Sequence, residues 1–387
     1  MRRDARRLAA GMTLIEVLVA LGLSAMLMGG AFALVASQRR SFMAQSAIGR
    51  RQQELWVGLE FLQRDLRKGG MGFGFCRASS GGITYAAHAG CFPNGAASAQ
   101  PLHAVDFTDG GTGGADQVTI RYAEPPGNGA PDTKIKTAPP GSYVGWTAGN
   151  VTVEDARPFM QPYGCVCGTN CSLPSATFAV FFAAGATPPV CSLVQVTAAA
   201  CNTVPNTLTI QPKPVVNCSN IPIATQPYTP AAPSYAAGDS IVNLGKLRTI
   251  TYWIDTTLAN NPRLMRTVDN NDGVAAQVQV IATGVEDLQV VPACDLNNNG
   301  LIEPEGVGPA AKATDEWLNN AGADAAAPSC TSYPQVRVSL IGRTPQAAPG
   351  FTGAGRPALE NRLAGSADNF HRRILATTIS TPNLALP

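Results

Sequence analysis

Charged residues and histidine are scarce in this chain of 387 residues. Asp, Glu, Lys and Arg make up 14% of the sequence, against roughly 25% in soluble domains, and there are three histidines. None of these histidines stands in a zinc motif or a catalytic triad pattern. The formal net charge is +2, so there is no strong basic field to hold nucleic acid. We therefore expect no enzyme and no nonspecific nucleic-acid binder.

Glycine and proline, by contrast, are plentiful, with 39 and 30 residues. Both residue types favour turns and irregular loops, so a mostly helical protein is excluded. The length allows one large domain or two of ordinary size.

The N-terminus joins a basic head to a long apolar run. Four arginines lie within the first seven residues, and the run from Leu14 to Ala36 contains a single charge, Glu16. As a helix, this run would be about 35 Å long, enough to cross a bilayer. The leader arginines outweigh Arg39 and Arg40 beyond the run, which predicts an inner-membrane precursor with its N-terminus inside and the rest of the chain outside.

The junction before the run reads Gly11-Met12-Thr13-Leu14-Ile15-Glu16. A secretory signal has its cleavage site after the apolar region, whereas here the processing signal precedes it, so cleavage would leave the helix in the mature protein. This junction resembles the type IV prepilin signature. The resemblance implies a leader of residues 1–11, cleavage by prepilin peptidase between Gly11 and Met12, and N-methylation of Met12.

Glu16 has a physical role in this interpretation. A carboxylate inside an apolar helix is costly unless it is paired or reaches the interface. Cleavage creates an amino terminus at Met12, so in stacked helices Glu16 of one subunit would meet the Met12 amine of another. The alternative is that Glu16 lies near the headgroups of a plain single-span anchor.

Leucines continue the helical pattern beyond the apolar run. Leu55, Leu59, Leu62 and Leu66 form one stripe, and Gly69-Gly70 supplies a helix stop. We predict one helix from Leu14 to Lys68, with a membrane or filament half at 12–36 and an amphipathic half at 37–68 that packs on a sheet.

After residue 69 the sequence changes to short alternating runs, and we expect an extracytoplasmic β-rich domain over 69–387. The spacing of the runs favours an antiparallel sheet, giving an α+β fold of the pilin kind. Residues 122–239 are rich in proline, and we expect them to be an irregular insertion. The expected strands are 117–122, 240–244, 247–254, 264–267, 277–281, 285–291, 336–341 and 374–379.

Several later blocks resemble PilW-type minor pilins: RDLRKGGMGFGFC, ADQVTIRYAE, LRTITYWID, GVEDLQV and HRRILATTIS. The resemblance implies a low-abundance subunit that starts the pilus and sits at its tip. Its expected partners are other minor pilins, the major pilin, a tip adhesin, prepilin peptidase and the inner-membrane assembly platform, and its final place is the pilus on the cell surface. One alternative is a minor pseudopilin of a type II secretion system. Another, of a different class, is a membrane-anchored, calcium-stabilised binding module.

All ten cysteines lie on the side predicted to leave the cytoplasm, where an even number indicates disulfides that fasten loops. We expect Cys294 to pair with Cys330, and Cys76 with Cys91. A metal site at Cys165, Cys167 and Cys171 is a weaker alternative, because the C-x2-C spacing of zinc sites is missing.

The segment from Asp295 to Glu303 matches the first nine positions of a calcium loop, including a glycine at the sixth. Position 12 is Gly306 where the loop has glutamate, and Glu305 lies one residue early. The alternative is a solvated Asn-rich turn. We expect no certain cofactor and keep calcium as a candidate, of modest affinity, with these ligands: Asp295, Asn297, Asn299, Leu301, Glu303 and Glu305.

Overall fold

A computed structural model describes most of the chain. The described residues are 13–72, 104–127, 132–137, 149–174, 177–183, 190–201, 206–211, 235–258, 261–270, 274–297, 299–306, 315–318, 333–348 and 351–384. The chain divides into two compact units, Met1–Gln52 and Gln53–Pro387.

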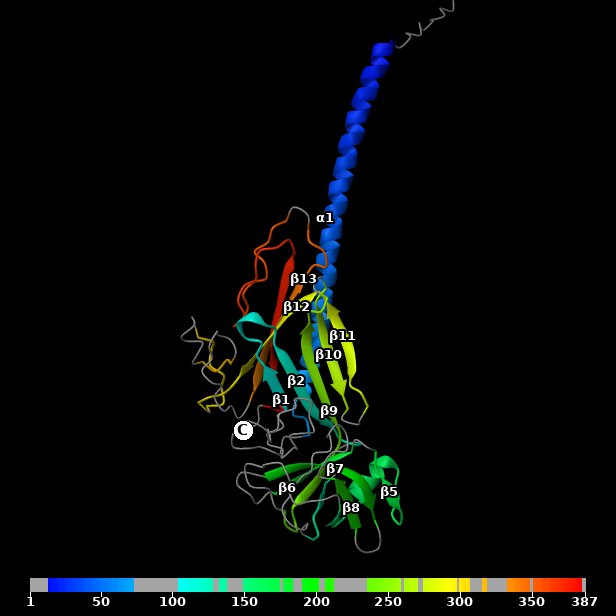
Figure 1. Cartoon of the computed structure of the whole chain (residues 1–387), viewed down its shortest axis with the longest axis vertical. Coiled ribbons are helices and arrows are strands. Elements are labelled where there is room, and N and C mark those ends of the chain that lie inside the picture. Colours follow the sequence, from blue (N-terminus) through cyan, green and yellow to red (C-terminus); the bar gives the residue numbers. More distant parts are fainter. Residues whose placement is uncertain are drawn as a thin grey trace, which may run out of the picture. The chain divides into compact units, whose positions relative to one another are not determined.

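One helix, α1 (Leu14–Lys68), runs from the first unit into the second (Figure 1). Its bounds are those predicted from the sequence. Gly70 adopts a positive φ of 78°, and the N–H groups of Gly69 and Met71 donate to the carbonyls of Leu66 and Lys68. These bonds satisfy carbonyls that the helix end would leave without partners.

The four stripe leucines, Leu55, Leu59, Leu62 and Leu66, are all buried. They pack with residues from two antiparallel sheets, which together form the main core of the second unit. At about 1.5–3 kcal/mol for each fully buried leucine, the stripe is a large part of what holds the helix to the sheets. The strands of this core are β1 (Val105–Thr108), β2 (Gln117–Glu124), β9 (Ser240–Asp255), β10 (Arg263–Asp269), β11 (Gln277–Thr283), β12 (Val285–Ala293), β13 (Gln335–Arg343) and β14 (Arg372–Ser380).

The pairing of these strands is antiparallel throughout. One sheet has the order β12-β13-β14, and the other places β1 and β2 on one side of β9 and β10 and β11 on the other. The expected strands of this region are all present, each extended by a few residues, with one difference. The two strands predicted at 240–244 and 247–254 are a single strand, β9.

Gly245 explains why β9 continues through the predicted break. It has a φ of 67°, and a side-chain Cβ placed there would lie 2.2 Å from the carbonyl oxygen of Glu124. Before Gly245 the strand pairs with β3 (Asp132–Lys134) and β6 (Phe178–Ala183), and after it with β2 and β10. The glycine therefore lets one strand serve two sheets.

The insertion, expected to be irregular, contains a sheet and a core of its own. Phe159, Phe181 and Tyr235 lie in this second core. Most of its strands are short and are separated by prolines and turns, so their alternation was too weak to be recognised in the sequence. The remaining elements are β4 (Gly149–Val153), β5 (Asn170–Ser172), β7 (Val190–Ala200), β8 (Asn206–Gln211), the short helix α2 (Arg157–Met160) and the 3-10 turns η1 (Gly111–Gly113) and η3 (Gln161–Tyr163).

Candidate functional site

The start of α1 is a capping box. Glu16 accepts hydrogen bonds from the backbone N–H of Thr13 at 2.9 Å and from its hydroxyl at 3.0 Å, while the Thr13 hydroxyl accepts from the N–H of Glu16 at 3.3 Å. Side chains at these two positions satisfy N–H groups that the first turn would otherwise leave without partners. Sequence reasoning assigned Glu16 to charge pairing between subunits and missed this local role, although the T-x-x-E spacing was visible. Gly11 and Met12 lie outside the described residues.

The segment Leu14–Arg39 of α1 is long and apolar enough to cross a membrane, and none of its most apolar window is buried within the chain. Large apolar side chains along it are exposed, among them Leu14 at 79%, Met26 at 78% and Phe32 at 74%. A surface of this kind on a soluble protein would cause aggregation, so it indicates a lipid or protein environment.

A buried polar cluster fastens the second half of α1 to the sheet. Asp65 on α1 is 1% exposed and accepts a hydrogen bond from the Tyr252 hydroxyl of β9 at 2.7 Å. The Arg266 guanidinium of β10 donates to the same carboxylate from Nε at 2.9 Å and from its terminal nitrogen at 2.8 Å. Burial, and then the neighbouring charge of Asp65, raises the pKa of Tyr252. The phenol therefore remains a donor at any working pH.

A second contact lies near the start of the packed half. The carboxylate of Glu54 accepts from the backbone N–H of Thr283 at 3.1 Å and from its hydroxyl at 2.7 Å. Four residues further on, Gly58 lies so close to the sheet that an added Cβ would be 3.0 Å from Leu264 and 3.7 Å from Ala282. These contacts fix the height of β10 and β11 along the helix.

The calcium-like segment folds as a tight turn. Both oxygens of Asp295 accept backbone N–H groups, from Asn299 at 3.1 Å and from Gly300 at 2.7 Å. The side-chain oxygen of Asn297 accepts from the Asn299 N–H at 2.9 Å, and that of Asn299 accepts from the Leu301 N–H at 2.8 Å. The loop is thus held by its own side chains, as a solvated Asn-rich turn would also be.

Glu305, the candidate for the last ligand, forms an ion pair with Arg337 at 2.9 Å. Glu316, which sequence reasoning did not single out, spans the loop by accepting from the N–H groups of Leu296 at 3.1 Å and Glu303 at 2.7 Å. Within the described residues there is no group of three or more His, Cys, Asp or Glu placed to hold a metal. Calcium binding at this loop stays a prediction.

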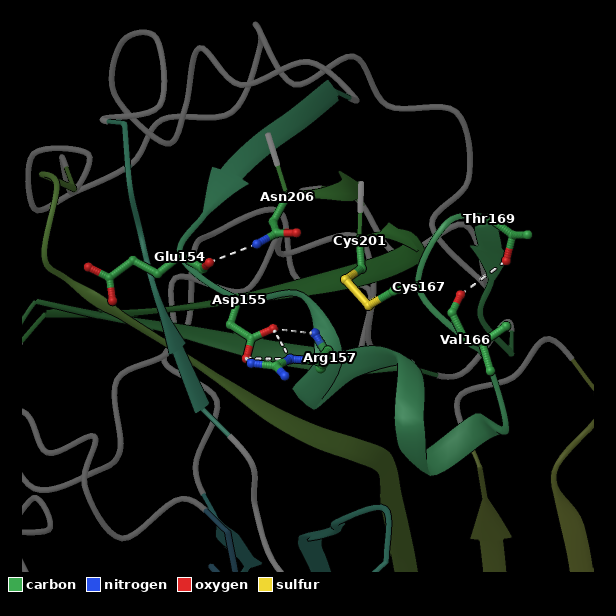
Figure 2. The surroundings of a disulfide bond; sticks show 8 residues. All are labelled: Glu154, Asp155, Arg157, Val166, Cys167, Thr169, Cys201 and Asn206. Atoms are coloured by element: carbon green, nitrogen blue, oxygen red, sulfur yellow. Dashed lines mark hydrogen bonds and ion pairs between the residues drawn. A yellow bond between two sulfur atoms is a disulfide. The ribbon is translucent and has the colours of Figure 1, made fainter. Parts of the chain in front are cut away.

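Four cysteines in the described part of the insertion form disulfides, Cys165 with Cys171 and Cys167 with Cys201. Figure 2 shows Cys167 and Cys201 beside the start of α2, where Asp155 binds Arg157. Since these sulfurs are bonded to one another, the alternative of a metal site at 165, 167 and 171 is wrong.

Of the other predicted pairs, Cys294 is disulfide-bonded. Cys330, its expected partner, lies outside the described residues, as do Cys76 and Cys91, so both pairings stay predictions.

Asp116 is a buried carboxyl group away from the helix start. It is 3% exposed, and its oxygens accept from the N–H of Gly110 at 3.0 Å and of Val290 at 2.7 Å. Burial raises the pKa of Asp116 to about 7, with smaller contributions from the charges of Asp109 and Asp287, against the two hydrogen bonds that lower it. Asp116 therefore joins the η1 turn to β12 in a way that depends on pH.

Two family models match the chain. Residues 251–383 match type IV pilus-assembly protein W, and residues 6–32 match the prokaryotic N-terminal methylation motif. The first match covers the end of β9 and strands β10 to β14. These strands belong to the sheets that pack on the leucine stripe. The second covers the capping box and much of the exposed apolar half of α1.

Among solved structures, a type IV-like pilin from Thermus thermophilus is similar, with 14% sequence identity over 37% of this chain and 72% of that chain and a TM-score of 0.24. No curated protein matches the chain.

Proposed function

We propose that this type IV pilus-assembly protein of the PilW type, which carries the N-terminal methylation motif, is a minor pilin that starts a pilus and becomes part of it. The observation that carries the proposal is the division of α1. Its first half leaves its apolar side chains exposed, while its second half buries a leucine stripe in a sheet. A prepilin needs both, because its helix first lies in lipid and then packs against other helices in the filament.

In this proposal, prepilin peptidase cuts between Gly11 and Met12, and Met12 is then N-methylated. The mature chain starts at Met12, so the new amine is adjacent to Thr13, whose hydroxyl and N–H bind Glu16. The carboxylate held at this end of the helix meets the amine of a neighbouring subunit. Pairing of the two charges in an apolar surrounding offsets the free-energy cost of leaving water.

The experiment that tests the processing is mass analysis of the mature N-terminus in cells with and without prepilin peptidase. Methylated Met12 as first residue, lost without the peptidase, is the expected result. An intact leader in assembled filaments would overturn the proposal.

The charge pairing is tested separately with Glu16→Val and Glu16→Gln, using Glu60→Gln on the exposed face of α1 as the control. We expect both Glu16 variants to insert into the membrane and to be incorporated into filaments at a level at least tenfold lower. Glu16→Gln retains the capping hydrogen bonds and loses the charge, so normal incorporation of this variant would refute charge pairing and leave only the capping role.

We further propose that the protein lies in a tip complex, beside other minor pilins, the major pilin and an adhesin. The family resemblance supports this part of the proposal. The type II secretion alternative shares the same helix and processing. A deletion strain separates the two, because loss of pili with normal secretion supports the minor pilin, and the reverse result supports the pseudopilin.

A further inference from the structure

Strand β11 is an edge strand. Among the described residues it pairs with β10 alone, so the peptide groups along its other side have no strand to pair with. Figure 1 shows β11 as the outermost strand of its sheet, next to β10. Such an edge is a template for another extended chain, and natural proteins usually block it with charges, proline or a very short strand.

The edge at β11 has none of these protections. Residues 274–285 contain no charged residue and no proline. Val278 is 58% exposed and Val280 is 45% exposed. By comparison, the edge strand β14 begins with Arg372 and Arg373, a pair of charges that disfavours strand addition.

The exposed valines continue a row of side chains across the sheet. Val280 lies opposite Met265 of β10, which in turn lies opposite Trp253 of β9. Gln279 is on the other face, where its side-chain oxygen accepts from Arg266 at 3.3 Å. Successive side chains of a strand alternate between faces, so both valines point away from the helix face, and the apolar row stops at the open edge.

The position of β11 connects this edge to assembly. Its last residue, Thr283, binds Glu54 of α1, and Ala282 lies near Gly58. These helix residues lie in the same continuous helix as the apolar half that the proposed filament buries.

We propose that β11 binds an extended segment of a neighbouring filament subunit, which joins the sheet as the strand next to β11; this inference rests on the proposed function. Main-chain hydrogen bonds would give the affinity, and alternate side chains the specificity. The segment fitting this edge is uncharged, with apolar residues beside Val278 and Val280 and polar residues beside Gln277 and Gln279.

A photocrosslinking experiment in cells that assemble pili tests the proposal on the full chain. The photoreactive residue p-benzoylphenylalanine replaces Val280 in one variant and, as a control on another surface, the 64% exposed Leu363 in a second. We expect the first variant to crosslink to a different pilin subunit, identified by mass spectrometry within an extended segment, and the second not to do so. Crosslinks to a second copy of this chain only, to a protein other than a pilin, or to nothing would overturn the proposal.

A charge variant provides an independent measurement. The double variant Val278→Lys with Val280→Lys places charges on the edge, and the double variant Val278→Thr with Val280→Thr keeps the β-branched shape without charge. Because both positions are exposed, neither change should alter thermal unfolding. We expect the amount of the lysine variant in sheared filaments to be at least tenfold lower than that of the unchanged chain. The amount of the threonine variant should stay within twofold of the unchanged chain.

Normal incorporation of the lysine variant would overturn the strand-addition proposal and leave the proposed function intact. Absence of the unchanged chain from filaments would instead overturn the proposed function.

Discussion

Removal of the Asp65 carboxylate is the sharpest test of how the helix is fastened to the sheet. Asp65→Ala leaves Arg266, whose side chain is 10% exposed, without its acidic partner, and it removes the acceptor of the Tyr252 hydroxyl. Breaking a buried ion pair from one side costs about 3–5 kcal/mol, because the remaining charge stays buried. We expect the free energy of unfolding to fall by about that amount. Tyr252→Phe removes no charge but two hydrogen bonds, the one that the hydroxyl donates to Asp65 and the one that it accepts from Arg266 Nε at 3.0 Å, and it should cost about 1–2 kcal/mol.

The assay is urea unfolding of the full chain in mild detergent, followed by tryptophan fluorescence. Glu60→Ala, an exposed position on the same helix, is the control and should change the unfolding free energy by less than about 0.5 kcal/mol.

The double variant Asp65→Leu with Arg266→Met distinguishes the free-energy cost of an unpaired buried charge from the cost of lost packing. Replacing both charges with apolar side chains should restore most of the stability. If Asp65→Ala loses less than about 1 kcal/mol, or if the double variant is no more stable than Asp65→Ala, the assignment of the cluster as the anchor of the helix is refuted.

Four other predictions concern the rest of the chain. Ionisation of Asp116 disfavours the folded state, because folding raises the pKa of this carboxyl group to about 7 from an ordinary 3.8. The unfolding free energy should therefore fall as pH rises from 5 to 7, by on the order of 1 kcal/mol per pH unit. An unfolding free energy that does not change with pH in chemical denaturation would contradict this. Gly245→Ala should cost about 2–3 kcal/mol in the same measurement, since the added Cβ meets backbone at 2.2 Å. Changing Cys167 and Cys201 together to serine opens a long loop and should cost about 4 kcal/mol by the chain-entropy model, with an unchanged melting temperature as the opposing result. If the loop at 295–306 binds calcium, millimolar calcium should slow its cleavage by protease, and identical cleavage with chelator would remove calcium from consideration.

Local signals explain why α1 was predicted from the sequence with correct bounds. A helix stripe and a glycine stop act within a few residues of chain, so Leu55 to Leu66 and Gly69-Gly70 are sufficient to place it. The strands that pack on it, apart from β1, were found for the same reason, because one face of each is apolar. The calcium-like turn was recognised by spacing, but whether Glu305 faces a metal or Arg337 depends on β13, 32 residues away.

The insertion shows where such reasoning ends. Its strands other than β7 are only three to six residues long. Strand β9 serves both sheets through a single glycine, whose role depends on the carbonyl of Glu124, a residue far away in the sequence. The pairs of Cys165 and Cys167 likewise depend on which loops the sheet brings together. Sequence order says little about contacts of this kind, because many pairings of the same cysteines have similar chain entropy.

The sequence by itself determined the exposed apolar helix, its boundaries, the motif before it and the β-rich class of the domain after it, since each depends on periodicity or on neighbouring residues. Only the tertiary structure decided how Asp65, Tyr252 and Arg266 come together, which cysteines pair and which strand lies at the edge of the sheet among the described residues. Each of these depends on residues brought close in space by packing, where burial changes the energy of a charge or of an unpaired peptide group.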